Sequence, residues 1–230
     1  MSASSAPERA SNVTGNRKIL KPKLLLGEGK DEVAFFDAML KHLGKDDTQV
    51  LDYGGKSKLK PILAQLPLDP KWPEVEALLI TRDADFPREG DSRSAVRLAW
   101  DEVTGALRSA NLPVPRAHGE MTAAVDSSVR STPRLGVFLL PDGVNNGMLE
   151  DLCLAAVADD AATPCLDAYF HCLAAKGVTP PRNLLPKARA HAYLASRPVP
   201  DKRVGEAAIA GYWPWSAPAF APLLDFVRSA

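Results

Sequence analysis

Two aspartates that follow a short apolar run are the residues of this sequence best suited to chemistry. Residues 77–80 (ALLI) have the character of a strand buried on both faces, and Asp83-Ala84-Asp85 follows closely. In an extended segment, side chains two positions apart point the same way. Two carboxylates at close range resist joint ionisation, so a hard divalent cation between them is one interpretation. The other is a strand followed by an ordinary polar turn, where Asp is common.

The segments around this pair predict alternating strands and helices. Strands are predicted at residues 21–26, 49–53, 77–80 and 135–140. Helices are predicted at residues 31–43, 57–66 and 92–110, and from about residue 148. This alternation predicts an α/β fold with a mainly parallel four-stranded sheet flanked by helices.

The two ends of the chain differ from this central part. Residues 1–18 are rich in Ser, Ala and Asn without periodicity, which predicts a flexible tail. Residues 19–160 carry the α/β pattern, and residues 161–230 predict a helical C-terminal extension packed on the same domain. The aromatic segment GYWPW at 211–215 is expected to pack back onto the domain, because aromatic burial is favourable. An exposed stacking platform is the alternative.

Composition restricts the class of protein. The net charge is zero, which argues against a protein coated with nucleic-acid-binding charge, although a local basic face stays open. No apolar run approaches the length of a membrane span, and no signal-peptide core is present, so we expect a cytoplasmic protein without a membrane partner. Cys153, Cys165 and Cys172 lie in apolar helical surroundings and are expected to be reduced core thiols. The sequence does not indicate the oligomeric state.

Acidic side chains follow three of the four predicted strands and open the next helix. In chain order they are Glu28, Asp83, Asp85, Asp142, Glu150 and Asp151. Because ligands bind beyond the carboxyl ends of parallel strands, these carboxylates are expected to collect on one rim of the sheet. Their convergence predicts a Mg²⁺ or Mn²⁺ site, since such ions prefer oxygen ligands. A solvated rim of loops is the alternative.

The order of these motifs resembles the Toprim domain of topoisomerases, primases, small ribonucleases and OLD-type nucleases. The resemblance spans roughly residues 23–157. It depends on Gly27-Glu28-Gly29 after a strand, a Gly-Gly-Lys turn at 54–56, and the acidic pair at 83 and 85. Residues 28–32, 53–56 and 149–152 are most similar to a bacterial branch close to the OLD-type nucleases. The chain lacks their ATPase domain and Walker A motif. The resemblance implies a Toprim/Rossmann-like fold.

The resemblance also implies a function: Mg²⁺-dependent phosphoryl transfer on nucleic acid, with phosphodiester cleavage by a nuclease as the expected reaction. Glu28 matches the Toprim glutamate, an acid–base residue or metal ligand. Lys187 is a candidate charge partner near the phosphate. The implied catalytic residues are Glu28, Asp83, Asp85 and Lys187. The implied ligands of Mg²⁺ or Mn²⁺ are Glu28, Glu32, Asp83, Asp85 and Glu150.

Basic side chains gather in two places, at residues 56–60 and 182–203. Contacts to a nucleic-acid backbone require such patches, and Lys30, Lys56 and Lys58 are the expected contacts. A solvated charged face is the alternative. A second class of function also stays open, in which a Toprim-derived module binds nucleic acid or a partner protein without catalysis. The neutral net charge and the missing ATPase domain favour this module, whereas the completeness of the acidic set favours the enzyme.

Overall fold

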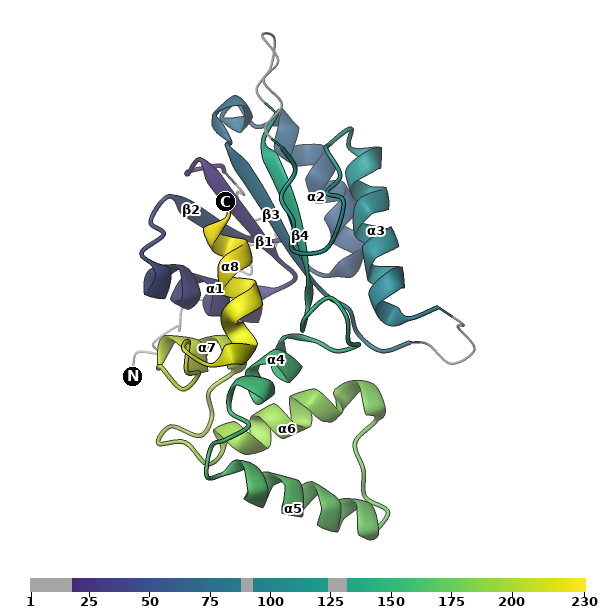
Figure 1. The fold of residues 1–230 in the computed structure, drawn as a ribbon, viewed down its shortest axis with the longest axis vertical. Helices are drawn as coiled ribbons and strands as arrows, with labels where there is room; N and C mark the ends of the chain where they lie inside the picture. Colours follow the sequence, from purple (N-terminus) through teal and green to yellow (C-terminus); the bar gives the residue numbers. More distant parts are fainter. Residues whose placement is uncertain (1–17, 88–92, 124–131) are drawn as a thin grey trace, which may run out of the picture.

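The computed structural model describes residues 18–87, 93–123 and 132–230, which form a parallel four-stranded sheet flanked by helices (Figure 1). The strands are β1 (Lys23–Gly27), β2 (Thr48–Asp52), β3 (Ala77–Asp83) and β4 (Arg134–Leu140), in the order β2-β1-β3-β4. All three neighbouring pairs are parallel. The predicted α/β class is therefore confirmed. The tail predicted for residues 1–18 lies, apart from Lys18, outside the described residues.

Helices cover both faces of this sheet. Their bounds are α1 (Lys30–Leu43), α2 (Leu59–Gln65), α3 (Ala95–Ser109), α4 (Leu149–Ala156), α5 (Thr163–Ala175), α6 (Leu185–Leu194), α7 (Val204–Ile209) and α8 (Ala221–Arg228). Helices α1, α7 and α8 lie on one face and α2 and α3 on the other, while α5 and α6 lie next to α4 at one end (Figure 1). The helix predicted at 57–66 is α2 between two 3₁₀ turns, Lys56–Lys58 and Leu66–Leu68.

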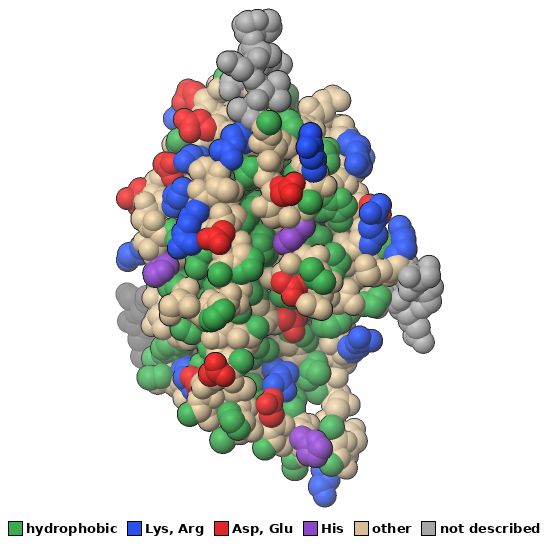
Figure 2. All heavy atoms as spheres, viewed as in Figure 1, with side chains coloured by type: hydrophobic (Ala, Val, Ile, Leu, Met, Phe, Trp, Pro, Cys, Tyr) green, Lys and Arg blue, Asp and Glu red, His purple; other side chains and the backbone are tan. Residues whose placement is uncertain are grey.

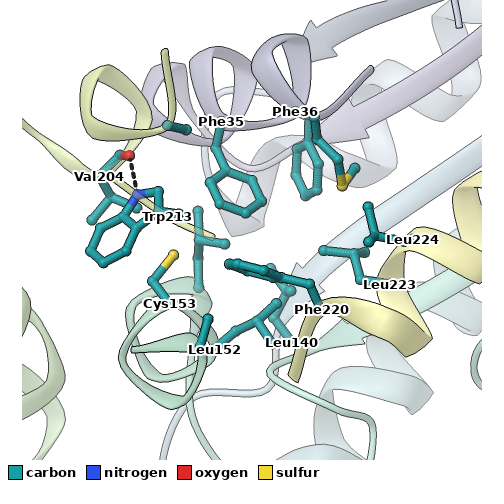
Figure 3. Packing of buried hydrophobic residues seen from close by; sticks show 14 of the residues in the cluster. Phe35, Phe36, Leu140, Leu152, Cys153, Val204, Trp213, Phe220, Leu223 and Leu224 are labelled. Atoms are coloured by element: carbon teal, nitrogen blue, oxygen red, sulfur yellow. Dashed lines mark hydrogen bonds between the residues drawn. The ribbon is translucent and has the colours of Figure 1, made fainter. Parts of the chain in front are cut away.

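Each face of the sheet has its own apolar core, because side chains alternate along a strand. Leu24 and Leu26 of β1 point into the core under α2 and α3, whereas Leu25 points into the core under α1 and α8. The second core also contains Trp213 and Phe220 from the C-terminal segment (Figure 3). Trp213 is almost fully buried, and its ring nitrogen donates a hydrogen bond to the carbonyl of Val204 at 2.9 Å. Trp213 therefore packs back onto the domain as predicted.

Helix α7 lies close against α1, whose first turn borders the candidate site. A Cβ added at Gly205 would lie 2.4 Å from the backbone oxygen of Asp31 and 2.6 Å from the Cβ of Ala34. We expect Gly205→Ala to lower the free energy of unfolding by about 2 kcal/mol, as overpacking does. Gly105→Ala is the matched control, because a Cβ in this part of α3 meets nothing within 4 Å. Gly105→Ala should instead raise the free energy of unfolding by roughly 0.5–1 kcal/mol. Urea unfolding measures both values, and equal effects would contradict the close packing.

The cysteine prediction is only partly correct. All three cysteines are free, and Cys153 is buried in the core as expected. Cys165 and Cys172 are exposed, so the prediction of core thiols is wrong for these two. The reason is that α5 lies at the edge of the fold and buries only Leu166 among its residues. No helix within the described ranges combines the length and apolar character needed to cross a bilayer.

Candidate functional site

The candidate site lies where the chain reverses its direction across the sheet. From β1 the chain moves to β2 on one side, and β3 is then added on the other side of β1. The carboxyl ends of β1 and β3 therefore flank a topological switch point, where open α/β sheets bind ligands. Glu28 directly follows β1, and Asp83 is the last residue of β3. The parallel pairing thus brings together acidic residues that are 55 positions apart in the sequence.

A buried arginine connects the acidic residues on one side of the sheet. The Arg82 side chain is only 4% exposed, and its Nη1 lies 3.1 Å from Glu28 Oε2 and 3.5 Å from Asp85 Oδ2. Its Nη2 donates to Glu102 Oε2 on α3 at 2.6 Å. Lys56 forms a second ion pair with Asp85. Because one nitrogen contacts both Glu28 and Asp85, these two predicted site residues lie side by side.

Asp83 occupies the other side of the sheet, since neighbouring strand residues point to opposite faces. It is buried, and its Oδ1 accepts a hydrogen bond from the backbone N–H of Leu149, the first residue of α4, at 3.0 Å. Glu32 and Glu150 lie close enough to act on its charge. Lys187 of α6 pairs with Glu150 at 3.2 Å and provides the positive charge on this side. The structure therefore brings the predicted Lys187 to the acidic cluster.

Burial and mutual repulsion make this cluster costly to ionise. Burial raises the pKa of Asp83 well above its usual value, and the charges of Glu32 and Glu28 raise it further. Burial also raises the pKa of Glu32. The pKa of Glu28 is raised by burial as well, although Arg82 opposes this shift. These carboxyls therefore keep their protons to a higher pH than ordinary carboxyls do. Its carboxylates are Glu28, Glu32, Asp83, Asp85 and Glu150, and the cations paired with them are Arg82, Lys56 and Lys187.

Within the described ranges, no three His, Cys, Asp or Glu side chains are already arranged to hold a metal ion. Two observations explain why these carboxylates are not arranged around a metal position. Arg82 and Lys56 occupy the carboxylates of Glu28 and Asp85. The Oε2 of Glu32 accepts a hydrogen bond from the N–H of Gly29 at 3.0 Å. Binding a metal would therefore require these carboxylates to exchange their present partners.

The backbone at Asp85 departs from the extended conformation expected for the acidic pair. Asp85 has φ of +64°, in the left-handed region that Asp tolerates better than most residues. Its N–H and C=O form an antiparallel bridge with Gly147, with hydrogen bonds of 2.7 and 2.8 Å. The expectation of a continuous extended segment is therefore wrong beyond Asp83. The bridge nevertheless holds the Asp85 segment against the turn that precedes α4.

A cavity of about 340 Å³ opens beside the cluster. It lies between the turn that follows β1 and the turn that follows β2. Its lining residues are Glu28, Gly29, Lys30, Glu32, Asp52, Gly54 and Gly55. Two of the predicted metal ligands therefore face the cavity, whereas the buried Asp83 does not line it. Of the predicted nucleic-acid contacts, Lys30 lines the cavity, Lys56 contacts Asp85, and Lys58 is exposed in the neighbouring 3₁₀ turn.

Two further strand-end or helix-start carboxylates have local structural roles. Asp142 accepts hydrogen bonds from the N–H groups of Val144 and Asn145, at 2.9 and 2.7 Å, and so stabilises the turn after β4. Asp142 therefore follows β4 at the same edge of the sheet, but its carboxylate is engaged in this turn. Asp151 accepts from the N–H of Met148 at 2.9 Å and caps the start of α4.

Two arginines of the second basic group, at residues 182–203, pair with acidic side chains. Arg189 pairs with Asp167, and Arg197 pairs with Asp160 at 3.0 Å. Lys/Arg and Asp/Glu side chains are interspersed over the face in Figure 2. The cations that approach the cluster come instead from separate elements: Arg82 from β3, Lys56 from the turn after β2, and Lys187 from α6.

The half-buried Asp151 gives the protein a pH-dependent stability. Burial raises its pKa to about 6. A carboxyl whose pKa is raised by folding stabilises the protein at low pH, and this contribution is lost as the pH rises through 6. Asp151→Asn keeps an acceptor for Met148 but does not titrate. We expect its free energy of unfolding, relative to the wild type, to be about 1 kcal/mol higher at pH 8 than at pH 4, after allowance for solvent screening. Urea unfolding at both pH values measures this gain, and a pH-independent difference would contradict it.

Sequence reasoning missed the central role of Arg82 and the participation of Glu102. The available signal was a charged residue within an otherwise apolar strand, where burial requires a partner. The partner could not be identified, because Glu102 lies on a helix whose rotation about its axis is set by tertiary packing.

Comparison with known proteins adds one match. A family model described as a protein of unknown function (DUF3226) matches residues 22–230. No curated protein and no solved structure matches the chain.

Proposed function

The chain belongs to the DUF3226 family, whose description names no activity, and from the site itself we propose that it cleaves nucleic-acid phosphodiesters with Mg²⁺ or Mn²⁺. One observation carries this proposal: carboxylates from separate segments converge at the switch point of a parallel sheet. They come from the end of β1, the start of α1, the end of β3 and the start of α4. The resemblance of the sequence motifs to Toprim domains supports the same function.

The residues at the site fit a hard divalent cation in their chemistry. Every candidate ligand is a carboxylate, and carboxylate oxygens are the ligands that Mg²⁺ and Mn²⁺ prefer. A cation at this place would offset the repulsion and burial that raise the pKa values of Asp83 and Glu32. For Glu28, Asp83 and Asp85 to hold one ion, Glu28 and Asp85 would have to leave Arg82 and turn toward Asp83, which now lies on the other side of the sheet. Glu32 or Glu150 would join for a second ion. A bound ion supplies positive charge to the phosphoryl oxygens and lowers the pKa of water.

The protein's own side chains provide the remaining chemistry. Glu28 faces the cavity and can accept a proton from the attacking water, since its raised pKa makes it a better base than an ordinary glutamate. Lys187 lies beside Glu150 and can pair with a phosphate oxygen. Lys30 lines the cavity, and Lys56 and Lys58 lie in the 3₁₀ turn that follows its lining residue Gly55. All three can contact neighbouring phosphates. The free cysteines suit a reducing compartment, and we place this activity in the cytoplasm.

A second function is favoured by one specific observation. Arg82 and Lys56 already pair with Glu28 and Asp85. A rim whose Glu28 and Asp85 already hold fixed cations suits a non-catalytic module that binds nucleic acid or a partner protein there.

A cleavage assay separates the two functions. Supercoiled plasmid, single-stranded DNA and structured RNA are incubated with the purified protein in Mg²⁺, Mn²⁺ or EDTA. The nuclease predicts strand cleavage in either metal and none in EDTA. Binding in a gel-shift assay without cleavage would support the non-catalytic module and overturn the enzyme. Neither binding nor cleavage of any substrate would overturn the nucleic-acid function in both forms.

A further inference from the structure

An aromatic side chain and an arginine meet directly beside the acidic cluster. Phe86 follows Asp85 in the chain and is half-buried. The guanidinium carbon of Arg182 lies over its ring, 5.8 Å from the ring centroid. Arg182 is exposed and begins the 3₁₀ turn Arg182–Leu184, which leads into α6. Two segments that are distant in the sequence therefore converge at the edge of the site.

The contact between these two side chains is loose enough to be exchanged. A separation of 5.8 Å is close to the outer limit for a cation over an aromatic face. Within the described part of the chain, Arg182 makes no hydrogen bond and no ion pair, in contrast to Arg189 and Arg197 nearby in sequence. Its charge is therefore available to a ligand without the loss of a carboxylate partner.

The same segment also carries a cation into the cluster itself. Lys187 lies five residues after Arg182, on α6, and pairs with Glu150. A strand of nucleic acid whose phosphate reached Lys187 and the carboxylates would thus have a neighbouring nucleotide near Phe86 and Arg182. Aromatic rings and guanidinium planes are the surfaces on which unpaired bases stack.

We propose that Phe86 and Arg182 form a clamp for one unpaired base next to the phosphate held at the acidic cluster. This inference rests on the proposed function and names its substrate class: single-stranded nucleic acid, or a strand with an unpaired base, rather than an intact duplex. In a duplex both faces of each base are covered by its neighbours, so Phe86 has no face to stack on. Phe86 and Arg182 are positioning residues, and the carboxylates perform the chemistry.

The test compares two oligonucleotides with equal phosphate charge. Fluorescence anisotropy measures the binding of a labelled 20-mer of thymidine and of a labelled 20-mer of abasic sites, both in Ca²⁺. The wild type should bind the thymidine strand about tenfold more tightly, which is within the range for stacking of a base on an aromatic ring. Phe86→Leu should reduce that preference to near unity, and Phe86→Trp should retain it.

Phe170→Leu is the matched control, because Phe170 also has an arginine over its ring, Arg189 at 5.5 Å, but lies on α5. It should keep the tenfold preference. Equal binding of the two strands by the wild type would overturn the clamp while leaving the phosphate site intact. An equal loss in Phe170→Leu and Phe86→Leu would assign the effect to fold stability and also overturn it. If neither strand binds, the proposed function fails as well. A preserved preference without cleavage in Mg²⁺ would overturn catalysis alone.

Discussion

Asp83→Asn is expected to abolish metal-dependent cleavage while making the metal-free protein more stable. Loss of one ligand removes several kcal/mol of charge stabilisation in the transition state. A loss of about 3 kcal/mol corresponds to a rate reduced by roughly 100-fold or more. The amide keeps an acceptor for the N–H of Leu149, so the start of α4 stays in place. Cleavage rates in Mn²⁺ and thermal unfolding in EDTA measure the two effects.

The sign of the stability change follows from the raised pKa of Asp83. When folding raises the pKa of a carboxyl, ionisation costs stability above the pKa of the unfolded chain, and this cost grows as the pH rises. The amide does not titrate, so the advantage of Asp83→Asn should vanish near pH 4 and be large at pH 7. Asp142→Asn is the matched control, since Asp142 also follows a strand but stabilises a turn. It should keep wild-type cleavage. Full activity in Asp83→Asn would rule out its role.

Arg82→Met is expected to lower the free energy of unfolding by about 3 kcal/mol, because it leaves Glu28 without its buried cation. Methionine preserves most of the apolar stem, so the loss reports the charge and its hydrogen bonds rather than a cavity. This loss is at the lower end of the range for breaking a buried ion pair. The reason is that Glu102 is 60% exposed, so water can replace Arg82 as its partner. Urea unfolding of the metal-free protein measures the change.

A second variant separates the ion pair from other effects of Arg82→Met. Adding Glu28→Gln removes the unpaired carboxylate, so the double variant should recover much of the lost stability. No recovery would show that Arg82 stabilises the fold through other contacts, such as its bond to the Asp83 carbonyl. Wild-type stability in Arg82→Met alone would contradict the arrangement altogether.

The strands and the convergence of the acidic residues could be predicted from local pattern. The apolar runs at residues 77–80 and 135–140 lie in the central strand β3 and the edge strand β4. The general rule for ligands at strand ends brings Glu28 and Asp85 to one edge of the sheet without any tertiary information, but it does not show that Asp83 lies on the other side. Both inferences depend only on the spacing of apolar residues along the sequence and on the expectation that neighbouring strands are parallel.

The remaining features depend on tertiary packing, which local pattern does not encode. The composition of α5 is apolar enough for a core helix, yet Cys165 and Cys172 are exposed because no element covers their face within the described residues. Asp142 follows a strand as the other carboxylates do, but its carboxylate accepts a hydrogen bond from the side-chain amide of Asn145 within a turn. The pairing of Arg82 with Glu102 can be predicted only when the position of α3 relative to β3 is known.

Isothermal titration of the wild-type protein with MnCl₂ tests most directly whether the gathered carboxylates share a divalent ion. We predict saturable binding of at least one ion, accompanied by proton release because the carboxyls with raised pKa values must ionise. Asp83→Asn should eliminate this binding, and Asp142→Asn should retain it. The absence of any saturable heat in the wild type, at Mn²⁺ concentrations that support known carboxylate sites, would contradict the account.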